Sequence, residues 1–196
     1  MGHMKKLVGL CVGLMMIVGS VAVAQDSAGG KTKVIKTHET ATFVSANFDF
    51  DHADLSDPAS YSNGEGTSNT GKFTDQAVIE FAPDGNKCTV PGGVANAGTE
   101  FKLVGNEAVV RFTATLDLLF YKGTSATVCQ DFSTPPFPFL STTTETGVVT
   151  GGTGKYLGAT GTFTLNFKGA TLSLDATGVR VFGWVKGNGV TTITLP

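Results

Sequence analysis

Charged residues are scarce in this chain, and their scarcity excludes several classes of protein. Asp, Glu, Lys and Arg make up 15% of the 196 residues, against about a quarter in an average globular protein. The formal net charge is −2, so the chain lacks the basic excess that neutralises nucleic-acid phosphates. We therefore predict no nucleic-acid partner. Because 41% of the residues are hydrophobic, the chain is also unlike a charge-rich disordered protein.

A helical repeat of apolar residues is also missing after residue 24. Instead, the sequence has 26 glycines and frequent threonine, a composition that favours strands joined by tight turns. The length fits one domain. We therefore expect residues 25–196 to form a single all-β domain.

The first 24 residues have the pattern of a secretion signal. Two lysines precede an apolar run at 7–18, and Ala22-Val23-Ala24 matches a signal-peptidase site. Residues 1–3 look like a cloning remnant. We expect cleavage before Gln25 and a secreted or periplasmic protein without membrane contact afterwards. In the rival interpretation the mostly apolar stretch 7–24, about 18 residues long, spans a bilayer and stays as an anchor.

Cysteine is rare as well, with three residues in the chain. Cys11 lies in the signal, so the exported chain keeps Cys88 and Cys129, an even pair that predicts a disulfide. The bond would close a loop of about 42 residues and add about 4 kcal/mol of stability. Two cysteines without a CxxC motif or a nearby histidine pair make a poor zinc site, so we predict no metal. The remaining alternative is a pair of free, buried thiols.

Alternating apolar and polar residues predict long antiparallel strands. The clearest runs are 109–121, which we interpret as one strand, 162–168 and 179–186. Asn188-Gly189 is a strong hairpin signal, so 190–195 should return as the last strand. Further extended segments are expected at 33–50, 77–81 and 100–104, the last followed by a turn at Gly105-Asn106, with loops at 53–72 and 133–140. Because closing a sheet removes its exposed edges, the long amphipathic strands favour a β-barrel.

A glycine-rich segment at 149–164, VTGGTGKYLGATGTFT, resembles the signature of the allene oxide cyclase-like and dirigent-like superfamily. The resemblance covers the last third of the chain well. It implies a calycin-like antiparallel barrel of about eight strands with an interior cavity, here in a bacterial secreted member. The glycines also have a simple structural role, because they permit tight turns and strand bends. Their spacing is not that of a phosphate-binding loop.

The resemblance also implies a range of functions. Plant members bind a reactive small molecule in the barrel and steer its cyclisation or coupling without a cofactor, relatives often form trimers, and many bacterial secreted members have no known activity. We therefore expect a small hydrophobic ligand, no cofactor and a homo-oligomer, either a dimer or a trimer. No catalytic residue of the plant enzymes can be matched to this chain.

Candidate site residues come from polar clusters and from the polar faces of the strands. Asp49 and Asp51 would share a strand face and could perform acid/base chemistry, although a solvated strand end running into a loop is the simpler explanation. We assign catalytic roles to Asp49, Asp51, Arg111 and Asp117, and ligand binding to Tyr156, Asn166, Arg180 and Trp184. Their strand faces could line the lumen or meet solvent; small barrels usually fill their interior, which favours solvent.

Three functions remain open from the sequence. The barrel could bind a small hydrophobic molecule, it could be a cofactor-free cyclase or isomerase that holds a reactive substrate, or it could be a structural protein that assembles through its Thr-rich faces. An open lumen with convergent polar groups would favour the first two functions.

Overall fold

The computed structural model describes residues 30–45, 59–133, 139–174 and 180–196, without the side chains of residues 180 and 181. The signal segment predicted at 1–24 lies outside this part of the chain. The strands are β1 (Lys31–Ser45), β2 (Ser60–Ser68), β3 (Gly71–Cys88), β4 (Gly98–Phe112), β5 (Leu118–Asp131), β6 (Phe139–Gly152), β7 (Thr160–Leu174) and β8 (Arg180–Leu195). Apart from the short 3₁₀ turn η1 (Gly154–Tyr156), the described residues contain no helix.

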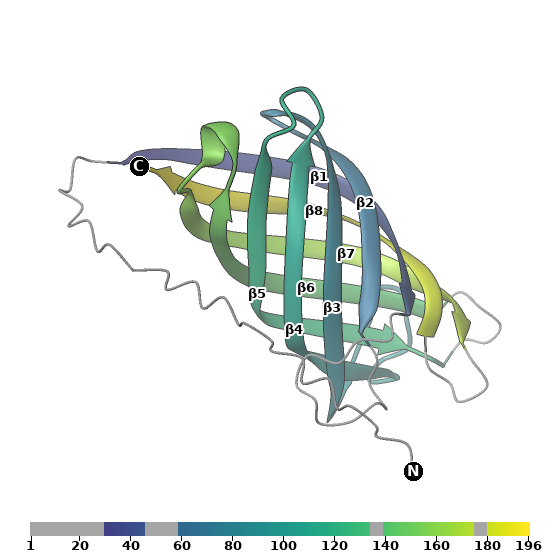
Figure 1. The fold of residues 1–196 in the computed structure, drawn as a ribbon. Coiled ribbons are helices and arrows are strands. Elements are labelled where there is room, and N and C mark those ends of the chain that lie inside the picture. Colours follow the sequence, from purple (N-terminus) through teal and green to yellow (C-terminus); the bar gives the residue numbers. More distant parts are fainter. Residues whose placement is uncertain (1–29, 46–58, 134–138, 175–179) are drawn as a thin grey trace, which may run out of the picture.

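Eight antiparallel strands form one closed barrel (Figure 1). Each strand pairs with the next in the chain, and β8 returns to pair with β1 from Lys31↔Leu195 to Val44↔Phe182. The predicted all-β class and the closure of the sheet are confirmed. In β7 the expected alternation also holds, because Phe163, Leu165 and Phe167 point inward while the residues between them face solvent.

The interpretation of 109–121 as one strand is wrong. β4 ends at Phe112 and β5 begins at Leu118, with a tight turn between them. The N–H of Leu116 donates to the carbonyl of Phe112 at 2.8 Å, and Leu116 has a φ of 61°, a left-handed conformation that breaks the strand. The alternation misleads because both flanking strands are amphipathic and the pattern continues across the turn.

The predicted turn at Asn188-Gly189 is also wrong, because β8 passes straight through it. Asn188 pairs with His38 on one side and with Asn166 on the other. A side chain at Gly189 would overlap Leu165, so glycine is present here for close packing between strands rather than for a turn.

The turn predicted at Gly105-Asn106 is a shift in strand register instead. Glu80 pairs with Gly105 and Phe81 with Leu103, which leaves Val104 as the extra residue, and β4 continues through the irregularity.

The loop predicted at 53–72 contains β2 and the start of β3, while 53–58 lie outside the described residues. β2 has few apolar residues because glycines occupy inward positions: a methyl group at Gly66 would overlap the ring of Phe73. In the second predicted loop, 133–140, residues 134–138 are not described and Phe139 begins β6.

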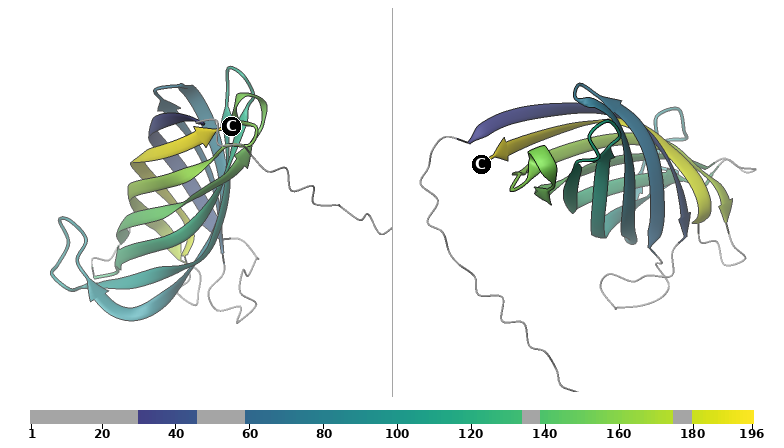
Figure 2. Two further views of the ribbon diagram at one scale, coloured as in Figure 1. Left: turned by 90° about the vertical axis from the view of Figure 1, so that its left-hand side faces the viewer. Right: turned by 45° about the horizontal axis from the view of Figure 1, so that its top comes forward.

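One end of the barrel is filled by a hydrophobic core. The core consists of Ile35, Phe73, Phe112, Leu119, Val149, Tyr156, Ala159 and Ile193. Tyr156 at the end of η1 is fully buried, and its ring centroid lies 5.0 Å from that of Phe112. Figures 1 and 2 show η1 beside the carboxyl end of β8. The glycine-rich segment thus places the ring of Tyr156 in the core that fills this end of the barrel.

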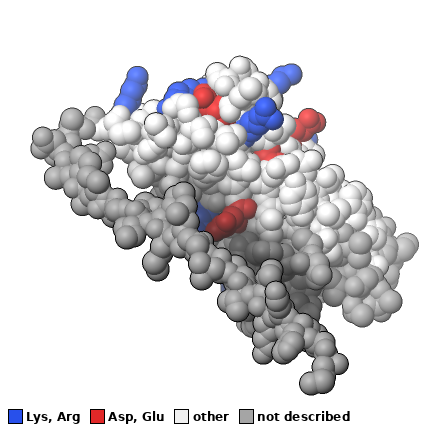
Figure 3. Space-filling model, viewed as in Figure 1, with Lys and Arg blue, Asp and Glu red and all other residues white. Residues whose placement is uncertain are grey.

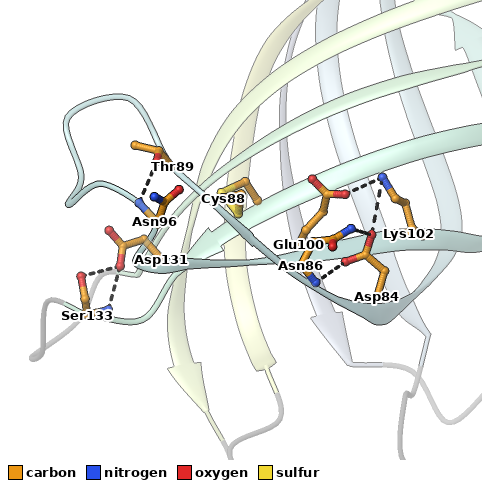
Figure 4. The surroundings of a disulfide bond; sticks show 10 residues. Asp84, Asn86, Cys88, Thr89, Asn96, Glu100, Lys102, Asp131 and Ser133 are labelled. Carbon is orange, nitrogen blue, oxygen red and sulfur yellow. Dashed lines mark hydrogen bonds and ion pairs between the residues drawn. A yellow bond between two sulfur atoms is a disulfide. The ribbon is translucent and has the colours of Figure 1, made fainter.

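The predicted disulfide is present and ties β3 to β5 across β4 (Figure 4). It joins Cys88 to Cys129 over a sequence separation of 41. A Cβ atom at Gly98, on the strand between them, would lie only 2.8 Å from the sulfur of Cys129 and 2.9 Å from that of Cys88. Glycine at position 98 therefore makes room for the bond. Among the described residues no helix is long and apolar enough to cross a membrane.

Candidate functional site

A cavity of about 140 Å³ lies inside the barrel, beyond the filled end. Its wall is mostly apolar and includes the side chains of Phe73, Val110, Phe163 and Leu165. A protein cavity of about 150 Å³ can hold one benzene molecule. The lumen therefore has room for a small organic molecule.

Three carboxyl side chains project into this cavity from three different strands. Glu39 comes from β1, Asp75 from β3 and Glu145 from β6. Each occupies a position where the alternation of its strand turns the side chain inward. Asp75 is 7% exposed and Glu145 is 3% exposed, so both acids have lost nearly all contact with bulk water.

Glycines on neighbouring strands make room for two of these acids. Gly64 of β2 pairs directly with Asp75, and a methyl group at position 64 would overlap Asp75 Oδ1. A Cβ atom at Gly123 of β5 would lie 2.5 Å from Glu145 Oε1. The carboxyls are thus packed against backbone, which fixes their positions in the wall.

Asn106 adds a buried amide to the wall of the cavity. It lies in β4, is 6% exposed, and its Nδ2 donates a hydrogen bond to Glu145 Oε1. Asn106 Oδ1 and Asp75 Oδ1 are buried and have no hydrogen-bond partner among the described residues. Such atoms are costly to leave unpaired, so the site contains two buried acceptors that a bound molecule could satisfy.

The acids influence one another's ionisation. Burial, followed by the negative charge of Asp75, a hydrogen bond with Asp75 and the charge of Glu145, raises the pKa of Glu39 to about 8. Burial raises the pKa of Asp75 to about 6, although the hydrogen bond from Glu39 opposes the shift. At neutral pH the pair therefore holds one proton, mainly on Glu39, and offers an acid next to a base.

Glu145 and Tyr121 complete the titratable groups of the lumen. Burial raises the pKa of Glu145 to about 7, against the hydrogen bond from Asn106. Burial also raises the pKa of Tyr121 to about 12, while a hydrogen bond with Thr191 opposes the rise. Tyr121 packs edge-on against Phe163, with ring centroids 5.3 Å apart. Its hydroxyl therefore stays neutral at physiological pH.

Two of the catalytic residues predicted from the sequence, Arg111 and Asp117, do not line this cavity. Arg111 is exposed on the outer face of β4. Asp117 lies in the turn between β4 and β5, with its Oδ2 3.6 Å from Lys155 Nζ. A hydrogen bond from Thr115 and the charge of Lys155 lower the pKa of Asp117. Asp49 and Asp51 lie outside the described residues.

The predicted ligand-binding residues fall into two separate places. Tyr156 belongs to the core that fills one end of the barrel and is not in the wall of the cavity. Asn166 and Trp184 lie on the outer face of β7 and β8, along a surface groove. Asn166 accepts a hydrogen bond from Thr144 at 3.1 Å, and Trp184 is 38% exposed. The side chain of Arg180 is not described.

The three acids and the amide of the lumen, Glu39, Asp75, Glu145 and Asn106, were not predicted as a site. A signal was present for Asp75, which occupies the same alternation phase as Phe73 and Ala77 in β3. An acid in the apolar phase of a strand is unusual, because burying an unpaired carboxylate is costly.

No group of three or more His, Cys, Asp or Glu side chains that could hold a metal ion occurs among the described residues. No family model, no curated protein and no solved structure matches this chain.

Proposed function

We propose that this protein is a secreted or periplasmic barrel that binds a small, mainly apolar molecule in its lumen. The observation that carries the proposal is the cavity of about 140 Å³, whose apolar wall contains a few buried polar groups. Ligand sites typically combine such a wall with a small number of placed polar groups that orient the ligand. The disulfide supports export, because such bonds persist mainly in oxidising compartments.

The same lumen supports cofactor-free isomerisation or cyclisation, of the kind that the resemblance to the allene oxide cyclase-like and dirigent-like superfamily implies. In this role Glu39 donates a proton and Asp75 accepts one, because burial and their mutual interaction separate their pKa values. The apolar wall would exclude water from a reactive intermediate. Among the described residues, Glu39 and Asp75 are better catalytic candidates than Arg111 and Asp117, while Asp49 and Asp51 lie outside the described part of the chain.

A non-enzymatic assembly protein is the second candidate, and the outer surface favours it. Exposed apolar side chains lie on neighbouring strands. Val44 of β1 pairs with Tyr61 of β2 and with Phe182 of β8. Trp184 of β8 lies two strands from the exposed Leu140 of β6. Figure 3 shows that charged side chains on the visible face gather mainly at its upper end. Exposed apolar side chains of this kind suit contact between copies in a dimer or trimer.

The two candidates can be separated by filling the cavity. Ala108 lies in its wall and faces Ala77 on the neighbouring strand. We expect Ala108→Phe to weaken the binding of benzyl alcohol by at least about tenfold, as measured by ligand-observed NMR titration, because the new ring would occupy the ligand's space.

The matched control is Val190→Phe, at an exposed position on the outer face of β8. It should bind benzyl alcohol as the wild type does. Equal affinity in Ala108→Phe and the wild type, with both proteins folded by circular dichroism, would place the ligand outside the lumen and favour the assembly protein.

A further inference from the structure

Building on the proposed function, we infer that the lumen selects a molecule with a protonated amine on a small apolar body. The inference concerns the chemical class of the ligand, which lumen binding by itself leaves open. It rests on which polar atoms of the cavity lack partners, on the charges that face the cavity, and on the character of the remaining wall.

The cavity needs hydrogen-bond donors. Among the described residues of its wall, the buried side-chain atoms without a partner are Asp75 Oδ1 and Asn106 Oδ1, and both are acceptors. One N–H of the Asn106 amide already donates to Glu145. A ligand that only accepts hydrogen bonds would leave both oxygens unpaired, whereas an ammonium group carries three donors.

Among the described residues, the wall of the cavity also lacks a positive charge. Its titratable groups are Glu39 from β1, Asp75 from β3, Tyr121 from β5 and Glu145 from β6. No Lys, Arg or His is among the described residues that line it. Lys33, which also lies on β1, sits at the filled end, where its Nζ is 5.7 Å from the ring centroid of Tyr156.

The raised pKa values of the three acids have the same origin. Burial is the largest cause for each of them, and no positive neighbour in the described part of the chain contributes to any of the three. An ammonium group in the cavity would supply the missing charge and allow a carboxylate to form beside it. When the ligand enters as the neutral amine, the proton passes from the carboxyl O–H to the amine nitrogen, so charge and atoms balance.

The remaining wall favours an organic cation over a hydrated inorganic one. Phe73, Phe163 and Leu165 line the cavity beside the acids. Aromatic faces attract cations as well as apolar groups, whereas a small metal ion would bring water into an apolar space. An amine carried on a ring of benzene size fits both parts of the wall.

The test compares benzylamine with benzyl alcohol, which has a similar shape but no charge. Isothermal titration at a pH of about 7 on the wild-type protein should show benzylamine binding at least about tenfold more tightly, since hydrogen bonds between charged groups are the stronger ones. Equal or weaker binding of benzylamine, with benzyl alcohol still bound, would overturn the amine inference and leave the proposed function intact. Failure of both molecules to bind would contradict both proposals.

Two variants test whether the preference for the amine arises in the lumen. Asp75→Asn and Glu145→Gln should each reduce the preference for the amine by several-fold while leaving the affinity for benzyl alcohol nearly unchanged. Glu107→Gln is the matched control, because Glu107 is exposed on β4 next to Asn106. An amine preference that survives in both lumen variants, or that falls in Glu107→Gln, would show that the preference arises outside the lumen and contradict the inference.

Discussion

Raising the pH from about 5 to about 9 is expected to lower the melting temperature of this protein. In the folded protein the pKa values of Glu39, Asp75 and Glu145 are raised to about 8, 6 and 7. Across this range the folded protein therefore holds protons that the unfolded chain has released. The stabilisation by each protonated acid is complete below its ordinary pKa and is lost as the pH rises through its folded value.

The expected loss of stability between these pH values is large. One unit of pKa shift corresponds to about 1.4 kcal/mol, so the three coupled acids together change the free energy of unfolding by several kcal/mol, which is on the order of ten degrees in melting temperature. Asp117 acts in the opposite direction: its pKa is lowered, so its contribution is lost as the pH falls below about 4. Stability should therefore be highest at a pH of about 4 to 5.

Melting curves of Glu39→Gln test whether the buried acids cause this pH dependence. This variant cannot ionise at position 39, so its melting temperature should fall less between about pH 6 and 9 than that of the wild type. Glu107→Gln, on the exposed face of β4, should keep the wild-type profile. A wild-type melting temperature that is constant or rises over this range would show that the acids are not buried as described.

Replacing Tyr156 by alanine should lower the free energy of unfolding by about 3–5 kcal/mol, as for other large aromatic residues removed from cores. Tyr156 is fully buried and packs on Phe112. Its hydroxyl has no hydrogen-bond partner among the described residues, so Tyr156→Phe should leave stability unchanged or raise it. Urea unfolding followed by fluorescence gives both values.

The neighbouring residue provides the control for this experiment. Leu157 is 71% exposed, so Leu157→Ala should change the stability by less than about 0.5 kcal/mol. A loss below about 1 kcal/mol in Tyr156→Ala would mean that the ring does not fill this end of the barrel. A large loss in Tyr156→Phe would mean that the hydroxyl has a partner.

The fold was largely predictable because alternation is a local property. Phe163, Leu165 and Phe167 reveal an inward face from sequence alone, and the even cysteine pair indicated the disulfide. Turns were harder to place. Gly189 looked like a turn residue but lies within a strand, where it permits close packing. Leu116 looked like a strand residue but adopts the left-handed conformation of a turn.

The lumen site was not predictable in the same way. Glu39, Asp75 and Glu145 are far apart in sequence and meet only because eight strands close in one register. Alternation places each acid on a face, but only the closed sheet decides which face surrounds a cavity. Arg111 and Asn166, the polar residues that alternation made most visible, lie outside the barrel because the apolar phase points inward.

The most direct test is a crystal structure of the protein grown with bromobenzene, in which the anomalous signal of bromine locates the ligand. We predict a bromine peak inside the barrel, between Phe73 and Phe163 and near Glu145. A lumen filled by side chains, with bromine only in the outer groove beside Trp184, would contradict the proposal that this barrel binds its ligand inside.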